Sequence, residues 1–130
     1  MEDQSYTVMV VEDEELLLQA ITKKLNLNGY QTVSCKSGAQ AFDYLKKNME
    51  KIPNAIWLDY YLKDMDGIVF MTFLKELKHT SEIPVMVISN SASDEKVHNM
   101  MILGVKKYML KAQYRLDDLI NALKDIMVVS

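Results

Sequence analysis

The stretch NAIWLDYYLKDMDG, residues 54–67, joins an apolar run to a cluster of acids. Its first part has the length and composition of a buried strand. The run stops at a carboxylate, Asp59, and Asp64 and Asp66 follow before Gly67. An acid at the end of a buried strand needs an explanation, and the rest of the chain supplies it.

The composition indicates one ordinary globular domain over residues 1–130, with a core of about residues 6–128. The chain has 130 residues, of which 49% are hydrophobic and 25% charged. A net charge of -3 gives no reason to expect binding to nucleic acid or to an anionic membrane. The single cysteine, Cys35, excludes an intrachain disulfide, and the N-terminal sequence has no signal-peptide pattern. We therefore expect a cytoplasmic protein.

Strand patterns alternate with helix patterns along the chain. Apolar runs predict strands at residues 8–11, 30–35, 54–58, 85–89 and 105–110. Ser37 and Ser93 are predicted N-caps of the second and fourth helices, and Gly104 ends the fourth. The first, second, third and fifth helices carry apolar residues at helical spacing, namely Leu17, Ile21 and Leu25; Phe42, Leu45 and Met49; Phe70, Phe73, Leu74 and Leu77; and Leu116, Leu119, Ile120 and Leu123. The alternation predicts an α/β fold, with a parallel five-stranded sheet covered by five helices on both faces.

Polar side chains follow four of these strands. Glu12 and Asp13 follow the first, Asp59 the third and Lys111 the fifth, and Ser89 ends the fourth. In an open parallel sheet, ligands bind at the carboxyl ends of the strands. Each residue alone has an ordinary explanation as a cap, a turn residue or a solvated side chain. Their joint placement at one edge predicts a site.

The chemistry of that edge points to a metal and a phosphoryl group. Three carboxylates repel one another unless a cation joins them, and hard oxygen ligands suit Mg²⁺. Lys111 and Ser89 are donors for anionic phosphoryl oxygens, and Asp59 is the candidate nucleophile.

Over essentially its whole length, the chain resembles the response-regulator receiver domains of two-component signalling, the CheY-like superfamily. The matching pieces are the pair Glu12-Asp13, Asp59 within DYYLKDMDG, Ser89 after VMVI, and Lys111 at the end of YMLK. The resemblance implies a doubly wound, flavodoxin-like sheet of strand order 2-1-3-4-5.

The resemblance also implies roles for individual residues. Asp59 would accept a phosphoryl group from a sensor histidine kinase or a histidine phosphotransfer protein, so the chain would be a switch and not a conventional enzyme. Mg²⁺, or Mn²⁺ in its place, would be bound by Asp13, Asp59 and the main-chain carbonyl of Tyr61, and by Glu12 through a metal-bound water. Lys111 would pair with the phosphoryl oxygens.

Two further residues would form the switch. Ser89 would swing inward to the phosphoryl group, and Tyr108 would turn inward behind it. The fourth helix, fifth strand and fifth helix, including Val97, Met101 and Lys107, would then be the surface for an output partner or a homodimer.

Three positions depart from the usual receiver pattern. Lys63 and Ala112 stand where receivers usually have proline, and Asn90 follows the switch hydroxyl where a small residue is common. A cis bond before a residue other than proline costs about 2.5–4 kcal/mol. We therefore predict a trans Lys111–Ala112 bond and a shifted loop before the fifth helix.

Other classes of protein fit less well. A flavodoxin-like electron carrier needs a phosphate loop where this chain has EDEE, residues 12–15, and a dehydrogenase needs a glycine-rich turn there. A receiver-like interaction module that is never phosphorylated stays open as the alternative.

Overall fold

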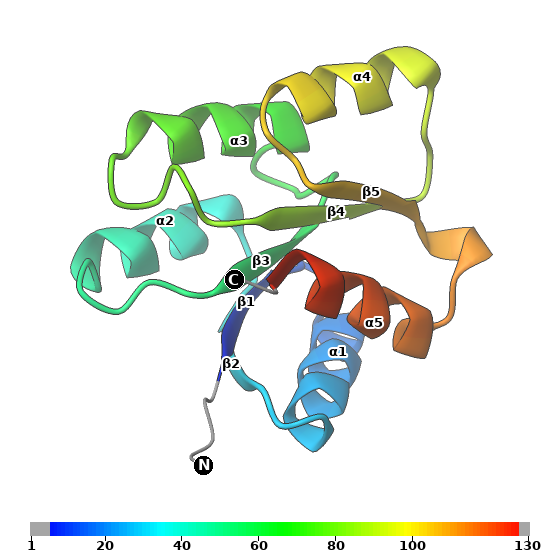
Figure 1. The fold of residues 1–130 in the computed structure, drawn as a ribbon, viewed down its shortest axis with the longest axis horizontal. Helices are drawn as coiled ribbons and strands as arrows, with labels where there is room; N and C mark the ends of the chain where they lie inside the picture. Colours follow the sequence, from blue (N-terminus) through cyan, green and yellow to red (C-terminus); the bar gives the residue numbers. More distant parts are fainter. Residues whose placement is uncertain (1–5, 128–130) are drawn as a thin grey trace.

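The computed structural model describes residues 6–127, in which strands and helices alternate (Figure 1). The sequence predicts that the core ends at about residue 128, which lies outside this range. The elements are β1 (Thr7–Val11), α1 (Glu15–Leu27), β2 (Gln31–Cys35), α2 (Gly38–Lys47), β3 (Ala55–Asp59), α3 (Gly67–Glu76), β4 (Val85–Ser89), α4 (Asp94–Ile102), β5 (Lys107–Leu110), a 3₁₀ helix (Lys111–Gln113) and α5 (Leu116–Met127).

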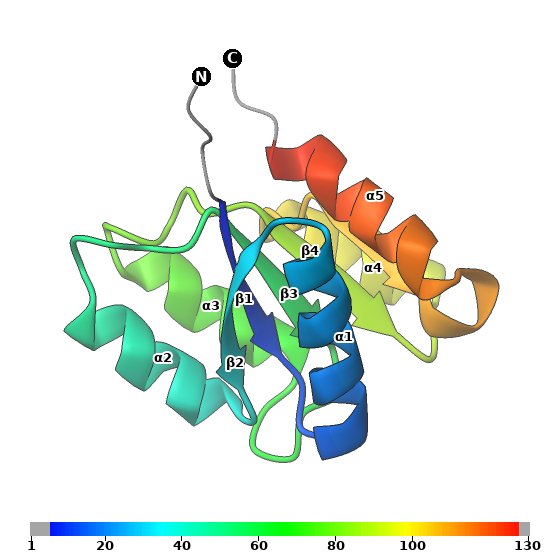
Figure 2. The same cartoon turned by 90° about the horizontal axis from the view of Figure 1, so that it is seen from below.

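The strands form one parallel sheet in the order β2-β1-β3-β4-β5. This confirms the predicted fold class and strand order. Helices α1 and α5 cover one face, and α2, α3 and α4 cover the other (Figures 1 and 2). Because all five strands are parallel, their carboxyl ends lie at the same edge of the sheet.

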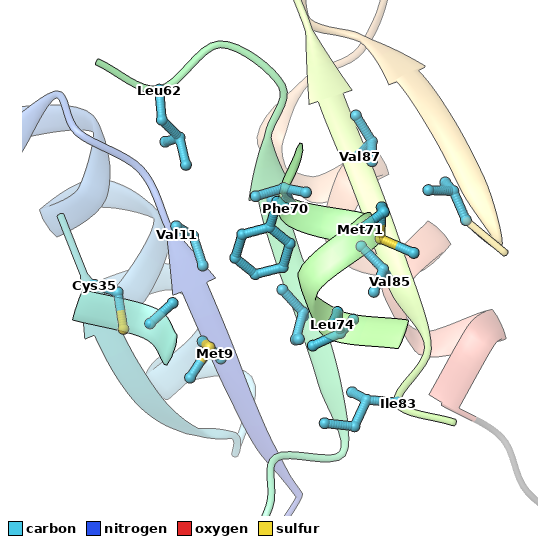
Figure 3. Close-up of a cluster of buried hydrophobic side chains, with 14 of the residues drawn as sticks. Met9, Val11, Cys35, Leu62, Phe70, Met71, Leu74, Ile83, Val85 and Val87 are labelled. Carbon is cyan, nitrogen blue, oxygen red and sulfur yellow. The ribbon is translucent and has the colours of Figure 1, made fainter. Parts of the chain in front are cut away.

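The two faces of the sheet belong to two apolar clusters. Successive strand residues point to opposite faces, so both sets must be apolar when both faces are covered. On one face, Phe70, Met71 and Leu74 of α3 pack over side chains of β1 and β4 (Figure 3). On the other face, Trp57 of β3 packs among residues of α1 and α5. This explains why the strand sequences do not alternate with polar residues.

The helix faces differ in detail from the sequence prediction. In α3 the predicted Phe70 and Leu74 are buried together with Met71, which was not predicted, whereas the predicted Phe73 is 46% exposed. Leu18 replaces the predicted Leu17 on the buried face of α1. The second helix ends at Lys47, so Met49 lies beyond it and is 59% exposed. Neighbouring apolar residues compete for one face, and their side-chain directions, not their spacing alone, decide which is buried.

The strand boundaries also differ from the predicted ones: β1 begins one residue earlier, and β2 and β3 begin one residue later. The third strand includes Asp59 itself, and the fifth begins at Lys107 and not at residue 105. Gly104 has a φ of +100°, which ends α4 in the left-handed conformation as predicted. Val105 and Lys106 lie between Gly104 and β5, and the amide of Lys106 already donates to the carbonyl of Val85 in β4 at 2.9 Å.

The predicted caps and peptide geometry are confirmed. The side chain of Ser37 accepts a hydrogen bond from the amide of Gln40, and that of Ser93 accepts one from the amide of Lys96. The Lys111–Ala112 bond is trans.

We predict that Leu74→Ala lowers the free energy of unfolding by about 2–5 kcal/mol, because Leu74 is fully buried and its truncation leaves a cavity. Leu27→Ala is the matched control. Leu27 is 75% exposed, so its loss should change stability by about 0.5 kcal/mol or less. Urea denaturation of both variants checks the comparison, and equal losses would contradict the assigned core.

Candidate functional site

The carboxyl edge of the sheet brings the predicted acids together. Glu12 and Asp13 follow β1, and Asp59 is the last residue of β3, which pairs directly with β1. One carboxylate oxygen from each of the three residues lies within 4.8 Å of the others. The spacing is short enough for one small cation to contact all three.

Lys111 reaches this cluster from the end of β5, the edge strand, which is separated from β3 by β4. It is the first residue after β5, and its Nζ lies 3.5 Å from Asp59 Oδ1 and 3.7 Å from Glu12 Oε1. Its side chain is 25% exposed, so it reaches the acids from a partly solvated position. The site thus holds three carboxylates and one ammonium.

The position of Asp59 changes its acidity. Asp59 is 7% exposed, and burial raises its pKa to about 6. Repulsion from Glu12 and Asp13 adds to the rise, while Lys111 opposes it. A second cation in the site would reduce the remaining repulsion. The charge balance therefore favours binding of a metal ion.

Hydrogen bonds hold Glu12 and Asp13 in place. Glu12 is 2% exposed, and its Oε2 accepts from the amide of Glu14 at 3.0 Å. Asp13 Oδ2 accepts from the amide of Lys63 at 2.7 Å. The loop after β3 is therefore fastened to the end of β1 through one of the candidate ligands.

The other side of the same loop is anchored by Asp64. Its two carboxylate oxygens accept from the amides of Gly38 and Ala39, at 3.1 and 2.9 Å, in the first turn of α2. These amides have no partner within the helix, and the helix dipole favours a negative charge there. Tyr61, whose carbonyl is a predicted metal ligand, lies in this anchored loop and forms a bridge with Asp66.

Ser89 and Tyr108 meet at one residue that the sequence did not single out. Ser89 is 1% exposed, and its Oγ accepts from the amide of Ser91 at 3.2 Å. The hydroxyl of Tyr108 donates to the carbonyl oxygen of Ser91 at 2.8 Å. Tyr108 itself is half-buried. Both predicted switch residues are therefore engaged with the segment between β4 and α4.

A small apolar cavity adjoins the site. Its volume is about 200 Å³, and Glu12, Lys111 and Trp57 are among the residues that line it, between α1 and α5. Trp57 is the only tryptophan of the chain. Its ring is thus placed to report on changes at the acidic cluster.

Sequence reasoning missed Asp64 and Ser91 as supporting residues. Aspartate in a loop and serine near a helix start are common turn and cap residues, so neither carries a distinctive pattern. The partners of Asp64 lie in α2, and Tyr108, which contacts Ser91, lies in β5, so both contacts join segments far apart in sequence.

The donor set fits a divalent metal. Glu12, Asp13 and Asp59 offer only carboxylate oxygens, which are hard ligands, and neither a cysteine nor a histidine belongs to this group within the described residues. This is a candidate divalent-cation site.

Comparison with known proteins identifies the family. A family model described as "Response regulator receiver domain" matches residues 8–124. The chain is 28% identical over 105 residues to the polar-differentiation response regulator DivK of Brucella ovis, and the match covers 81% of this chain and 83% of DivK.

Solved structures show the same architecture. The chemotaxis protein CheY4 of Vibrio cholerae has a TM-score of 0.85 at 19% identity, with 95% of this chain and 99% of that chain covered, which shows the shared fold. The phosphorylated cyanobacterial phytochrome response regulator RcpA has a TM-score of 0.78 at 25% identity, covering 95% and 91%. Since the family match spans most of the chain and the fold agrees with it, the chain belongs to the response-regulator receiver domains of two-component signal transduction.

Proposed function

We propose that this receiver is a Mg²⁺-dependent phosphoryl acceptor, with Asp59 as the nucleophile. The observation that carries the proposal is the buried Asp59 carboxylate, which lies within 4.8 Å of two other carboxylates and 3.5 Å from the Lys111 ammonium. A carboxylate between a cation site and an ammonium is suited to attack on an anionic group. Acetyl phosphate labelling, described below, tests it.

The donor is a phosphohistidine of a sensor histidine kinase or a histidine phosphotransfer protein. A carboxylate oxygen of Asp59 attacks the phosphorus, a P–O bond forms, and the P–N bond to the imidazole breaks. The electron pair of that bond stays on the departing imidazole nitrogen. Lys111 then pairs with the phosphoryl oxygens, since its ammonium already lies beside Asp59.

The proposed metal ligands are Asp13, Asp59 and the main-chain carbonyl of Tyr61, with Glu12 acting through a metal-bound water. When bound, Mg²⁺ supplies positive charge that offsets repulsion between the carboxylates and the incoming phosphoryl group. Mn²⁺ has the same preference for oxygen ligands and is the proposed substitute. The hydrogen bond from Lys63 keeps Asp13 at the site.

Phosphorylation is proposed to act as a switch and not as a step in the turnover of a separate substrate. Asp59 is consumed when it is phosphorylated and is restored only by hydrolysis, which the site itself assists. RcpA, described as phosphorylated, is a 25% identical receiver of the same fold and supports this assignment. Among the described residues, no helix combines the length and apolarity required to cross a membrane. We propose that the protein acts in the cytoplasm.

The output surface is proposed to be α4, β5 and α5. Ser89 is drawn to the phosphoryl group, and Tyr108 follows into the space that it leaves.

The side chains of this surface connect its elements. Met101 of α4 is 47% exposed, and Lys107 of β5 is paired with Asp125 of α5 at 3.4 Å. A shift of β5 is thereby transmitted to α5. An output partner or a second copy of the chain would bind there, next to Val97.

The alternative is a receiver-like interaction module that never becomes phosphorylated. The complete set of Asp59, Lys111 and the acidic pair favours the acceptor, because a binding module has no need of a clustered, destabilised carboxylate.

We predict that titration with Mg²⁺ quenches the fluorescence of Trp57, which lines the cavity next to Glu12 and Lys111. The metal binds the ionised form of Asp59, whose pKa is raised to about 6. Below that pH a proton must leave before the metal binds. The apparent affinity should therefore be about tenfold weaker at pH 5 than at pH 8.

Asp59→Asn should give no quenching, whereas Asp43→Asn, an exposed change on α2, should respond as the wild type does. The same response in wild type and Asp59→Asn would place the metal elsewhere.

We predict that acetyl phosphate with Mg²⁺ adds one phosphoryl group to the wild type and none to Asp59→Asn, as measured by intact mass. Lys111→Ala should keep partial labelling but lose the conformational response, because the ammonium links the phosphoryl group to the moving segments. Labelling that persists undiminished in Asp59→Asn would contradict the assigned nucleophile, and an unlabelled wild type would favour the interaction module.

We predict that beryllofluoride, a phosphoryl mimic, changes amide hydrogen exchange most within residues 89–116. This range contains Ser89, α4 and β5, which the switch displaces. Exchange measured with and without the mimic tests it. Changes centred on α1 and α2 would show that the switch runs along another route.

A further inference from the structure

All three hydrogen-bonding groups of Ser91 are engaged. Its amide donates to Ser89 Oγ at 3.2 Å, and its carbonyl accepts from the Tyr108 hydroxyl at 2.8 Å. Its own Oγ accepts from Lys96 Nζ at 3.2 Å. We call Ser89, Ser91, Lys96 and Tyr108 the Ser91 junction. It ties the end of β4 to β5 and to the first turn of α4.

Lys96 also connects this junction to the residues that follow Asp59. Its Nζ lies 4.8 Å from the ring centroid of Tyr60 and 4.5 Å from that of Tyr61, and it donates to the Tyr61 hydroxyl. Ring faces attract a cation, and each such contact is stronger when partly shielded from water. Lys96 is half-buried, so its position is defined by packing as well as by charge.

The arrangement restrains Ser89. For Ser89 to turn towards a phosphoryl group on Asp59, its Oγ must leave the amide of Ser91. That amide then needs a new partner, which requires the segment between β4 and α4 to move. Movement of Ser91 carries its Oγ away from Lys96 Nζ, which lies over the rings of Tyr60 and Tyr61. We therefore expect the contact between Lys96 and Ser91 to belong to the present conformation and to weaken when Ser89 turns.

We propose that Lys96 is a positioning residue that acts through Ser91 to hold Ser89 in its unphosphorylated conformation. This inference rests on the proposed function. A contact made in only one of two conformations shifts their equilibrium towards that conformation. Lys96 thus sets the affinity of the receiver for a phosphoryl group without contacting that group.

The test measures the affinity for beryllofluoride, in the presence of Mg²⁺, from the fluorescence of Trp57. Lys96→Met keeps the apolar stem over the tyrosine rings but removes the ammonium. We expect this variant to bind beryllofluoride about threefold to tenfold more tightly than the wild type, as the loss of one or two hydrogen bonds implies. Lys96→Arg, which can still donate to both hydroxyls, should remain near the wild type.

The control for charge is Lys106→Met, at an exposed lysine just before β5, which should leave the affinity unchanged. If Lys96→Met does not fold, as judged by circular dichroism, Lys96→Leu carries the same comparison, because it also lacks a donor.

A double-mutant cycle separates this role from a general structural one. Ser91→Ala removes the oxygen that Lys96 contacts, so it should itself tighten beryllofluoride binding. Adding Lys96→Met to Ser91→Ala should then change the affinity by less than about twofold. An undiminished effect of Lys96→Met in the Ser91→Ala background would overturn the proposal, as would unchanged or weaker binding by Lys96→Met alone.

The outcome also separates this inference from the proposed function. A wild type that binds beryllofluoride while Lys96→Met matches it would overturn only the role of Lys96. A wild type that fails to bind beryllofluoride would overturn both.

Discussion

Repulsion among Glu12, Asp13 and Asp59 is the constraint around which the carboxyl edge of the sheet is arranged. Their oxygens lie within 4.8 Å of one another, and two of the three side chains are more than nine-tenths buried. Buried carboxylates are costly unless they are paired or bind a metal. Lys111 offsets part of this cost, and the backbone amides of Glu14 and Lys63 offset more. The backbone pairing of β1 with β3 and the apolar packing on both of their faces prevent the acids from moving apart. Binding energy for a cation is therefore stored in the folded chain.

The sequence predicts the parts of this arrangement that follow from topology. Alternating strand and helix patterns imply a parallel sheet, and a parallel sheet places Asp59, Glu12 and Lys111 at one edge whatever the details of packing. It does not predict which apolar neighbour faces inward, as Met71 and Phe73 show, because both satisfy the same spacing. Nor does it predict Asp64 on the first turn of α2, or Ser91 between Ser89 and Tyr108. The contacts of Asp64 with α2 and of Tyr108 with Ser91 join side chains to backbone groups of distant segments, and no local pattern encodes them.

The departures from the usual receiver pattern gain a physical meaning from the structure. Lys63 stands where receivers usually have proline, and its amide donates to Asp13 Oδ2 at 2.7 Å. Proline has no amide hydrogen and could not make this bond. The loop after β3 therefore has a hydrogen bond to a candidate metal ligand that the common sequence lacks. Together with the two bonds from α2 to Asp64, it holds this loop at both sides.

The acidic site and the Ser91 junction are coupled because β3 and β4 are neighbours. Asp59 pairs in register with Ile88, the amide of Tyr60 donates to the carbonyl of Ile88 at 3.0 Å, and Ser89 is the next residue of β4. The strands themselves have close-packed apolar side chains on both faces, and such packing does not deform gradually. The polar segments beyond the strand ends lie outside this packing, and Ser91, in one of them, is exposed. The edge that concentrates negative charge therefore also contains the Ser91 junction, one strand away from Asp59.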